Sequence, residues 1–318
     1  MPIALALQDY SAINQCFTPL GINERLVYVR PDGVKYRLHA PPSRVVMTEE
    51  GFGTPPMEYI VDQAPFQHGD TVRNVLLQPR PVQLVVMQNF VSRPAYWDGR
   101  ASLLDAIRPN RVTDFNNPGS LLYYLGNGDR RQLDVFLDSG PGFAPRAGGW
   151  REWMFTEVLR FTAHDPVWYD PTQQSTVFTV ATDNLVFPTT FPITFETFGG
   201  TAAVAYLGTW LEYPSFTVTG PISGLHVHNH TTDDHIALEY DLPAGYSLTI
   251  VLNGVKTITR SDGLNLLNYL SDDSDLTTWS LAPDPVAAGG INSVHIQGTG
   301  TSGATAATMN WYNRFFGI

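Results

Sequence analysis

The 318-residue chain has one cysteine, few charged residues and no long apolar run. Cys16 alone excludes an internal disulfide framework and is compatible with assembly in a reducing compartment. No stretch approaches the ~20 apolar residues that a membrane span needs. Residues 1–7 are apolar, but they lack a basic flank and are too short for a signal peptide. We therefore expect no membrane insertion, and we expect residues 1–7 to form a first strand.

Basic residues are scarce. Lys and Arg total 19 against 30 Asp and Glu, which gives a formal net charge of −11 at pH 7. Such a balance argues against general nucleic-acid binding, because nothing offsets the repulsion of phosphate. Hydrophobic residues make up 43% of the chain, and there are 27 glycines and 24 prolines. This composition indicates a globular protein of many short strands and turns.

Alternation of apolar and polar residues is abundant in the second half of the chain. Phe216 and Val218 alternate with polar neighbours until Gly220-Pro221 ends the strand, and residues 236–240 and 248–250 alternate again. Asn253-Gly254 then predicts a two-residue hairpin turn. This stretch predicts the core of a β-sandwich.

Other segments are predicted from the same signals. A helix is expected near residues 94–107, capped by Ser92 and ended before Pro109, with one apolar face formed by Tyr96, Trp97, Leu103, Leu104 and Ile107. Residues 40–69 are expected to be loop, and 199–201 flexible, because glycine or proline is frequent there. Residues 150–163 fit a strand face and a helix face equally well. Further strands are expected at 26–38 (a hairpin), 72–90 (broken at Pro79 and Pro81), 121–125, 132–138, 176–180, 192–195, 291–296 and 309–312.

Histidines are concentrated between residues 226 and 235, in a segment expected to be a turn. In a strand, His226, His228 and His230 would share one face, and three imidazoles on one face could bind zinc or nickel. The alternative is a polar face leading into a Thr-Thr-Asp-Asp turn. The polar-face interpretation is favoured, since no second cluster of ligands supports a metal. We therefore predict no metal-binding residues.

Acidic and aromatic residues supply the other candidates. Asp233-Asp234 and the carboxylates of Asp272, Asp273 and Asp275 could serve glycoside hydrolysis or calcium binding, but acidic loops are usually solvated turns. The seven tryptophans could include a sugar-stacking platform but more often fill cores or subunit interfaces. No nucleophile elbow, phosphate loop or dinucleotide fingerprint is present. We predict no catalytic residues, no cofactor and no enzymatic activity.

Short motifs follow one another in order over nearly the whole chain. In the first half the set comprises residues 78–84, the 93–104 helix, 109–111, 131–138 and 164–169. In the second half it comprises 212–221, 231–232, 242–250 and 311–318. This ordered set resembles the distal tail (Dit) proteins of long-tailed phages, the siphophage tail-tip hub family. The chain departs from the family pattern at Val251-Leu252, in its histidine-rich segment and at 185–210.

The resemblance implies a mainly β protein of two domains, and the composition shifts between 165 and 200. Residues 1–175 would be an N-terminal belt, a ring-forming β-sandwich with one α-helix and a β-hairpin. Residues 176–318 would be a galectin-like β-sandwich. The resemblance also favours a strand at 150–163.

The function implied is structural. A hexameric ring would connect the tail tube protein to the tail-tip hub and adhesion apparatus, including receptor-binding or side-fibre proteins, around a lumen for DNA. The protein would be assembled in the host bacterial cytoplasm and would reside at the distal tail tip of the virion. The alternative is a glycan-binding host-attachment module, with Trp210, Trp279 or the histidine-rich segment as its site.

Overall fold

The computed structural model describes residues 25–39, 41, 44–109, 117–143, 154–179 and 198–318. It is mainly β and divides into two compact units. Unit 1 comprises Met1–Pro171 together with Phe316–Ile318, and unit 2 comprises Thr172–Phe315. The expected strands at 1–7 and 192–195 lie outside the described residues.

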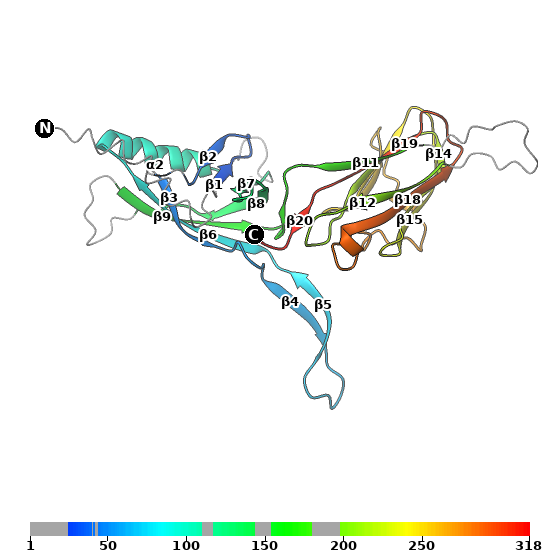
Figure 1. Cartoon of the computed structure of the whole chain (residues 1–318), viewed down its shortest axis with the longest axis horizontal. Helices are drawn as coiled ribbons and strands as arrows, with labels where there is room; N and C mark the ends of the chain where they lie inside the picture. Colours follow the sequence, from blue (N-terminus) through cyan, green and yellow to red (C-terminus); the bar gives the residue numbers. More distant parts are fainter. Residues whose placement is uncertain (1–24, 40, 42–43, 110–116, 144–153, 180–197) are drawn as a thin grey trace, which may run out of the picture. The chain divides into compact units, whose positions relative to one another are not determined.

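Unit 1 is built on an antiparallel sheet of order β2-β1-β7-β8-β9-β6-β3 (Figure 1). Alternation along its strands places apolar side chains on a common inner face, as Val82, Leu84 and Val86 of β6 illustrate. The strands are β1 (Arg25–Val29), β2 (Lys35–Arg37), β3 (Arg44–Glu50), β6 (Arg80–Asn89), β7 (Gly119–Tyr124), β8 (Arg130–Ser139) and β9 (Met154–Ala163), and the short β10 (Trp168–Tyr169) also pairs with β8.

Strand β8 connects the two halves of this sheet. Residues Arg130–Val135 pair with β7, whereas Phe136–Ser139 pair with β9, and the register shifts near the end of the strand. Because β8 pairs with both halves, the two halves of the sheet can pack over a common core. Strand β9 confirms the strand interpretation of residues 154–163, and residues 150–153 lie outside the described part of the chain.

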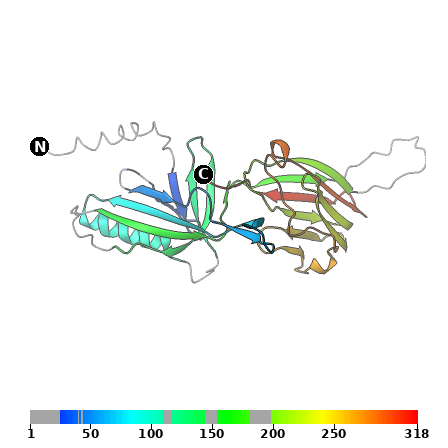
Figure 2. The ribbon, with the colours of Figure 1, turned by 90° about the horizontal axis from the view of Figure 1, so that it is seen from below.

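Helix α2 (Arg93–Ile107) confirms the predicted helix and runs along the sheet near β9 (Figures 1 and 2). The Ser92 side chain accepts a hydrogen bond from the Ala95 amide, as an N-cap does. The buried residues of helix α2 are Leu103, Ala106 and Ile107. The predicted apolar face was partly wrong, because Trp97 and Leu104 are 53% and 47% exposed. They are seven residues apart and form a separate stripe beside the buried one.

Unit 2 is a sandwich of two antiparallel sheets, which confirms the predicted β-sandwich core. Buried apolar side chains alternate along both sheets and meet between them, as Phe216 and Val218 do with Val227 and Ile296. One sheet has the order β11 (Gln174–Thr179), β19 (Ala306–Trp311), β13 (Ser215–Thr219), β16 (Ser247–Val251), β17 (Thr257–Arg260). The other has the order β12 (Phe198–Ala205), β18 (Ile291–Thr299), β14 (Ile222–Asn229), β15 (Asp234–Leu242). Outside the two sheets are the 3-10 turns η2 (Leu267–Tyr269) and η3 (Ala288–Gly290) and the short β20 (Arg314–Phe315).

Several local predictions were wrong. Residues 40–69 contain β3 and β4 (Met57–Asp62), because strand pairing outweighs the local glycines and prolines. Residues 199–201 belong to β12, where β18 pairs with them. The β16–β17 hairpin does not turn on two residues, since Val251 pairs with Thr257 and the loop between them is longer. Gly254 nevertheless has the predicted positive φ, of 62°.

Candidate functional site

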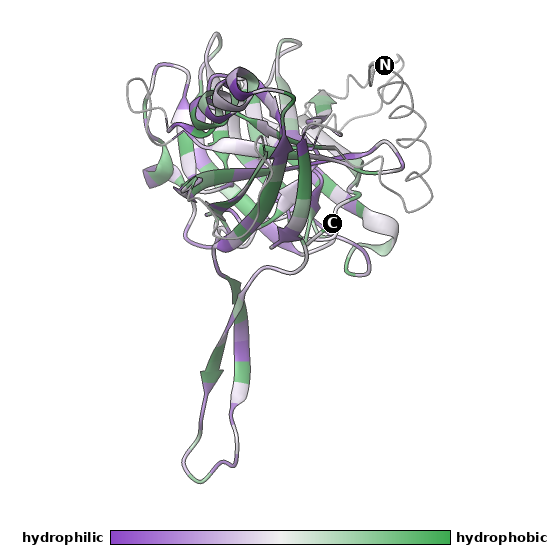
Figure 3. Ribbon diagram, turned by 90° about the vertical axis from the view of Figure 1, so that its left-hand side faces the viewer, coloured by the Kyte–Doolittle hydropathy of each residue, from purple (hydrophilic) through white to green (hydrophobic). Residues whose placement is uncertain are grey.

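The most exposed element of unit 1 is a hairpin formed by β4 and β5 (Thr71–Leu77), which extends away from the sheet (Figures 1 and 3). The two strands pair with each other from Met57–Leu77 to Asp62–Thr71, and within the described ranges they pair with no other strand. Every residue of β4 is exposed. The exposed apolar side chains of the hairpin are Met57, Tyr59, Ile60, Val61, Phe66, Val72 and Leu76.

Local hydrogen bonds shape this hairpin. Arg73 Nε lies 2.7 Å from Asp62 Oδ2 across the strands, but both side chains are about two-thirds exposed, so the ion pair is weak. In the loop, Gln67 Oε1 accepts from the Ala64 amide and Gln67 Nε2 donates to Thr71 Oγ1, both at 2.9 Å. An isolated two-stranded hairpin is at best marginally stable in water. An apolar, solvent-exposed hairpin is therefore a candidate interaction surface.

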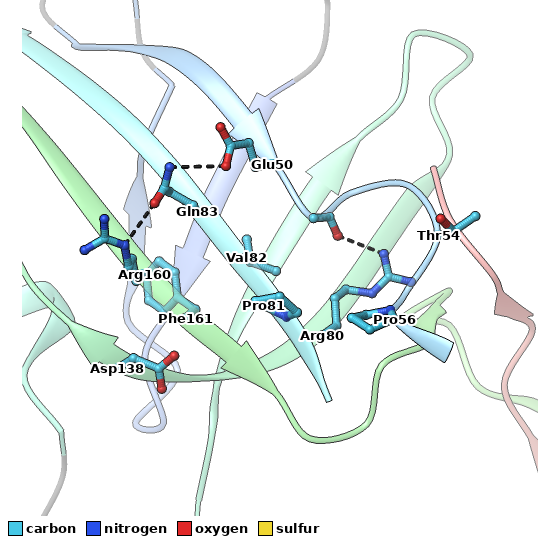
Figure 4. Close-up of a pocket in the computed structure, with 11 residues that line it drawn as sticks. Glu50, Thr54, Pro56, Arg80, Pro81, Val82, Gln83, Asp138, Arg160 and Phe161 are labelled. Atoms are coloured by element: carbon cyan, nitrogen blue, oxygen red, sulfur yellow. Dashed lines mark hydrogen bonds between the residues drawn. The ribbon is translucent and has the colours of Figure 1, made fainter. Parts of the chain in front are cut away.

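A cavity of about 390 Å³ lies where the hairpin leaves the sheet (Figure 4). Gln83 links two of its lining side chains, donating to Glu50 Oε2 at 3.2 Å and accepting from Arg160 Nε at 2.9 Å. Arg80 lines the same cavity, but its donors bond main-chain carbonyls, including that of Gly51. The hydrogen bonds of Gln83 and Arg80 stabilise the segment from which the hairpin extends.

A second exposed apolar feature of unit 1 is the stripe of Trp97 and Leu104 on α2. The Arg100 guanidinium lies 4.8 Å from the centre of the Trp97 ring and 4.0 Å from that of Phe143. This stacking restrains the indole of Trp97, so the side chain would lose little conformational entropy when a partner contacts it. The α2 helix and the β4–β5 hairpin lie on opposite sides of unit 1 (Figures 1 and 3).

In unit 2, His226, His228 and His235 lie on strands β14 and β15, whereas His230 lies in the turn of residues 230–233 between them, so the expected turn covers only part of residues 226–235. His226 and His228 alternate with the buried Leu225, Val227 and Asn229 on β14, and His230 follows the strand. The predicted shared face of these three imidazoles is therefore confirmed. The fold adds two more, because His235 of β15 and His295 of β18 both pair directly with His228.

The electrostatics of this face favour the neutral form of His226 and of His230. Burial, followed by the neighbouring His235 and His228, lowers the pKa of His226. Burial, followed by electrostatic repulsion from His228 and His295, lowers the pKa of His230. A neutral imidazole keeps one nitrogen lone pair available for a ligand or a hydrogen-bond donor.

The candidate acids lie around these histidines. Asp275 Oδ2 is 3.3 Å from His235 Nδ1, and Asp273 Oδ2 is 3.4 Å from His235 Nε2. A hydrogen bond from Ser271, and then one from His235, lower the pKa of Asp273. Asp233 Oδ1 lies 3.1 Å from His228 Nε2, and Asp234 Oδ1 accepts from Thr278 at 2.9 Å. Within the part of the chain described, no three His, Cys, Asp or Glu side chains are arranged to hold a metal ion as they stand.

The tryptophans divide between core and surface. Trp168, Trp279 and Trp311 are buried, as a core role requires. Trp210 is half-buried and Trp97 is exposed, while Trp150 and Trp153 lie outside the described residues. No helix in the described ranges is long and apolar enough to cross a membrane.

Comparison with known proteins finds a similar fold in a solved phage protein, SPP1 Dit. No protein-family model and no curated protein sequence matches the chain. Among solved structures, the crystal structure of SPP1 Dit, described as a paradigm of the hub adsorption apparatus in phages that infect Gram-positive bacteria, matches with a TM-score of 0.58 and 13% identity. The match covers 92% of this chain and 99% of SPP1 Dit, so the resemblance expected from the sequence motifs is confirmed at the level of the fold. The phage P2 baseplate in its activated conformation with Ca also matches, with a TM-score of 0.45, 10% identity, and coverage of 90% and 97%.

Reasoning from the residues alone missed two features of these surfaces. Strand β4 has apolar residues at alternate positions, Met57, Tyr59 and Val61, but the prolines and glycines around it favoured a loop. His295 is distant from the other histidines in sequence and joins them only through the pairing of β18 with β14. The resemblance did imply a β-hairpin in the N-terminal domain, although it did not give its residues.

Proposed function

We propose that this protein is a structural, non-enzymatic component of the tail tip of a long-tailed phage, where copies of unit 1 close a ring. The β4–β5 hairpin carries the proposal, because it exposes seven apolar side chains and pairs with no other strand of the described chain. The fold shared with SPP1 Dit over nearly the whole of both chains supports it. The partner best suited to the hairpin is a second copy of this chain.

A closed ring needs two different, complementary patches on each subunit. The hairpin provides one patch, and the exposed Trp97–Leu104 stripe of α2 provides a second on the opposite side of unit 1. Apolar contact between the hairpin of one copy and the α2 stripe of the next would bury both. That arrangement joins subunits head to tail, as ring closure requires.

Six copies would form the ring at the distal end of the tail tube. The tail tube protein would contact one side, and the tail-tip hub with its adhesion, receptor-binding or side-fibre proteins the other. The net charge of −11 would discourage DNA from adhering to the lumen during passage. Residues 1–175 would then be the belt and 176–318 a galectin-like accessory domain, in a virion protein assembled in the host cytoplasm.

The proposal is tested by native mass spectrometry and electron microscopy of the purified chain over a range of concentrations. We expect ring-shaped particles of six chains, and antibodies against the chain should label the distal tip of tails. A protein that stays monomeric at every concentration and is missing from tail tips would overturn the proposal.

The glycan-binding alternative gains no support from the tryptophans named for it. Trp279 is fully buried, with its ring 5.1 Å from that of Phe216, so it cannot stack on a sugar. Trp210 is half-buried. The structural role is therefore the function that the geometry supports.

A further inference from the structure

Three imidazoles form a compact triangle on the outer face of the β12-β18-β14-β15 sheet of unit 2. His228 and His235 pair directly across β14 and β15, and His226 lies two residues before His228 on the same face. The ring centres are 5.9 Å apart for His226 and His228, 5.4 Å for His226 and His235, and 6.2 Å for His228 and His235. All three sides of the triangle are therefore of similar length.

These separations are close to those of a three-histidine metal site. With metal–nitrogen distances of about 2.0–2.1 Å, three imidazoles on one tetrahedral zinc ion hold their ring centres roughly 5 to 5.5 Å apart. The triangle needs to contract by less than about 1 Å and to turn its nitrogens inward. At present the His226 and His235 rings are stacked at 28°, which explains why the nitrogens do not converge.

The contacts that would have to be exchanged are weak ones. His235 contacts the side chains of Asp273 and Asp275, and His228 contacts Asp233, whose side chain is 94% exposed. Ion pairs at such exposed positions contribute little to stability. The Nδ1 atom of His226 is buried and has no hydrogen-bond partner in the described part of the chain. A metal ion would give that nitrogen a partner.

We propose that His226, His228 and His235 bind one Zn²⁺ ion, with a carboxylate oxygen of Asp273 or a water molecule as the fourth ligand. Imidazole nitrogen with one oxygen ligand is a donor set typical of zinc. The neighbouring carboxylates of Asp273 and Asp275 would offset the charge of the ion and orient His235. The site lies within unit 2 and does not depend on the proposed ring.

His230 and His295 lie on the same face but outside the triangle. Their ring centres are 5.9 Å apart, and His295 is held by Thr201 at 2.9 Å and by Gln297 at 3.3 Å. The register places His295 and His235 on opposite sides of β14, so His295 cannot join a site centred between His226 and His235. His295 is therefore the matched control for the triad, whereas His230 is not, because its ring centre lies 4.2 Å from that of His228.

The test is titration of the full chain, purified without a histidine tag and stripped with a chelator, with ZnCl₂ in competition with a chromophoric chelator. We expect one Zn²⁺ per chain, and we expect His228→Asn and His235→Asn each to weaken binding at least about tenfold. His295→Asn and the exposed His68→Asn should bind as the parent does. Co²⁺ should give the intense visible absorption of a tetrahedral site in the parent and in these two controls.

Two results would overturn the proposal. One is the lack of any Zn²⁺ binding above that of the His228→Asn variant. The other is an equal loss of binding in His295→Asn and His228→Asn, which would indicate dispersed chelation by surface histidines. Far-ultraviolet circular dichroism of each variant separates loss of binding from loss of folding, because all four positions are at the surface or half-buried and the core does not change.

Discussion

The Nη2 atom of Arg80 donates to the main-chain carbonyl of Phe316 at 2.7 Å, which fastens the last residues of the chain to strand β6 of unit 1. The same guanidinium donates to the carbonyls of Pro166 at 2.6 Å and Gly51 at 2.8 Å, and to that of Gly53. Arg80 is fully buried, and burial lowers the pKa of its guanidinium to about 10, so it remains charged at neutral pH. Four carbonyls replace the water that the charge has lost.

Replacing Arg80 with Met should destabilise unit 1. The substitution removes the Arg80 donor from four partly buried carbonyls, which we expect to cost about 2–4 kcal/mol despite the relief of burying a charge. Denaturant unfolding measures the loss, and hydrogen exchange resolved along the sequence should assign it to β6 and its neighbours. Arg160→Gln is the matched control, because Arg160 is exposed and its side chain donates to that of Gln83.

A double-mutant cycle tests the link to the chain end. Deleting residues 316–318 removes the Phe316 carbonyl that accepts from Arg80. The loss of unfolding free energy in the combined variant should therefore be smaller than the sum of the losses caused by the deletion and by Arg80→Met separately. Strict additivity, or an Arg80→Met loss no larger than that of Arg160→Gln, would contradict the role assigned to Arg80.

A charge on the exposed hairpin should block ring formation without unfolding the chain. Ile60→Asp changes a side chain that is 43% exposed, so the free energy of unfolding of the monomer should change by less than about 1 kcal/mol. In an assembled ring the carboxylate would be buried without a partner, and association should weaken at least about tenfold. Sedimentation velocity across a concentration series gives the measurement.

The control for this prediction is Val177→Asp, an apolar-to-acid change at an exposed strand position of unit 2. This variant should assemble as the parent does. If Ile60→Asp forms rings at the same concentrations as the parent does, the hairpin is not the subunit contact.

Local sequence signals predicted the elements that the residues themselves mark. The N-cap at Ser92 and the alternation at Phe216 and Val218 are of this kind, and both predictions were confirmed, although β13 pairs with the distant β16 and β19. Strand β3 was missed because its apolar residues are consecutive and do not alternate, so only its pairing with β6 identifies it. Strand β4 does alternate, but the prolines and glycines around it favoured a loop. The position of His295 depends on a pairing that no local pattern encodes.

Gly119 is required for the packing of Tyr28, because a Cβ atom there would lie 2.2 Å from Tyr28 Oη and 2.6 Å from Cζ. Tyr28 is buried, with its ring 5.6 Å from that of Phe161, so it has little room to move. Gly119→Ala should therefore destabilise unit 1 by about 1–3 kcal/mol in denaturant unfolding. At Gly142 a Cβ would meet nothing within 4 Å, so Gly142→Ala should change stability by less than about 0.5 kcal/mol. Equal effects of the two substitutions would disprove the steric argument.

Tyr206 should make unit 2 sensitive to alkaline pH. Its hydroxyl donates to the carbonyl of Trp210 and accepts from the Arg314 amide at 3.1 Å, and burial raises the pKa of the phenol well above its usual range. The folded state must therefore keep Tyr206 neutral, whereas the unfolded chain ionises it near about pH 10. The resulting stability is fully present below that pH and is lost as pH rises toward the folded-state pKa, by up to about 1.4 kcal/mol per pH unit.

Tyr206→Phe removes both the hydrogen bonds and the ionisable group. It should cost about 1–3 kcal/mol at neutral pH, because the Trp210 carbonyl and the Arg314 amide each lose a buried partner. It should also flatten the fall in stability of unit 2 between about pH 9 and 11. Tyr269→Phe, at a side chain that is 45% exposed, should leave that fall unchanged. Urea unfolding at a series of pH values provides the comparison. Tyr206→Phe removes the phenolic proton, so stability curves that fall in parallel for the parent and for this variant would refute the role of Tyr206.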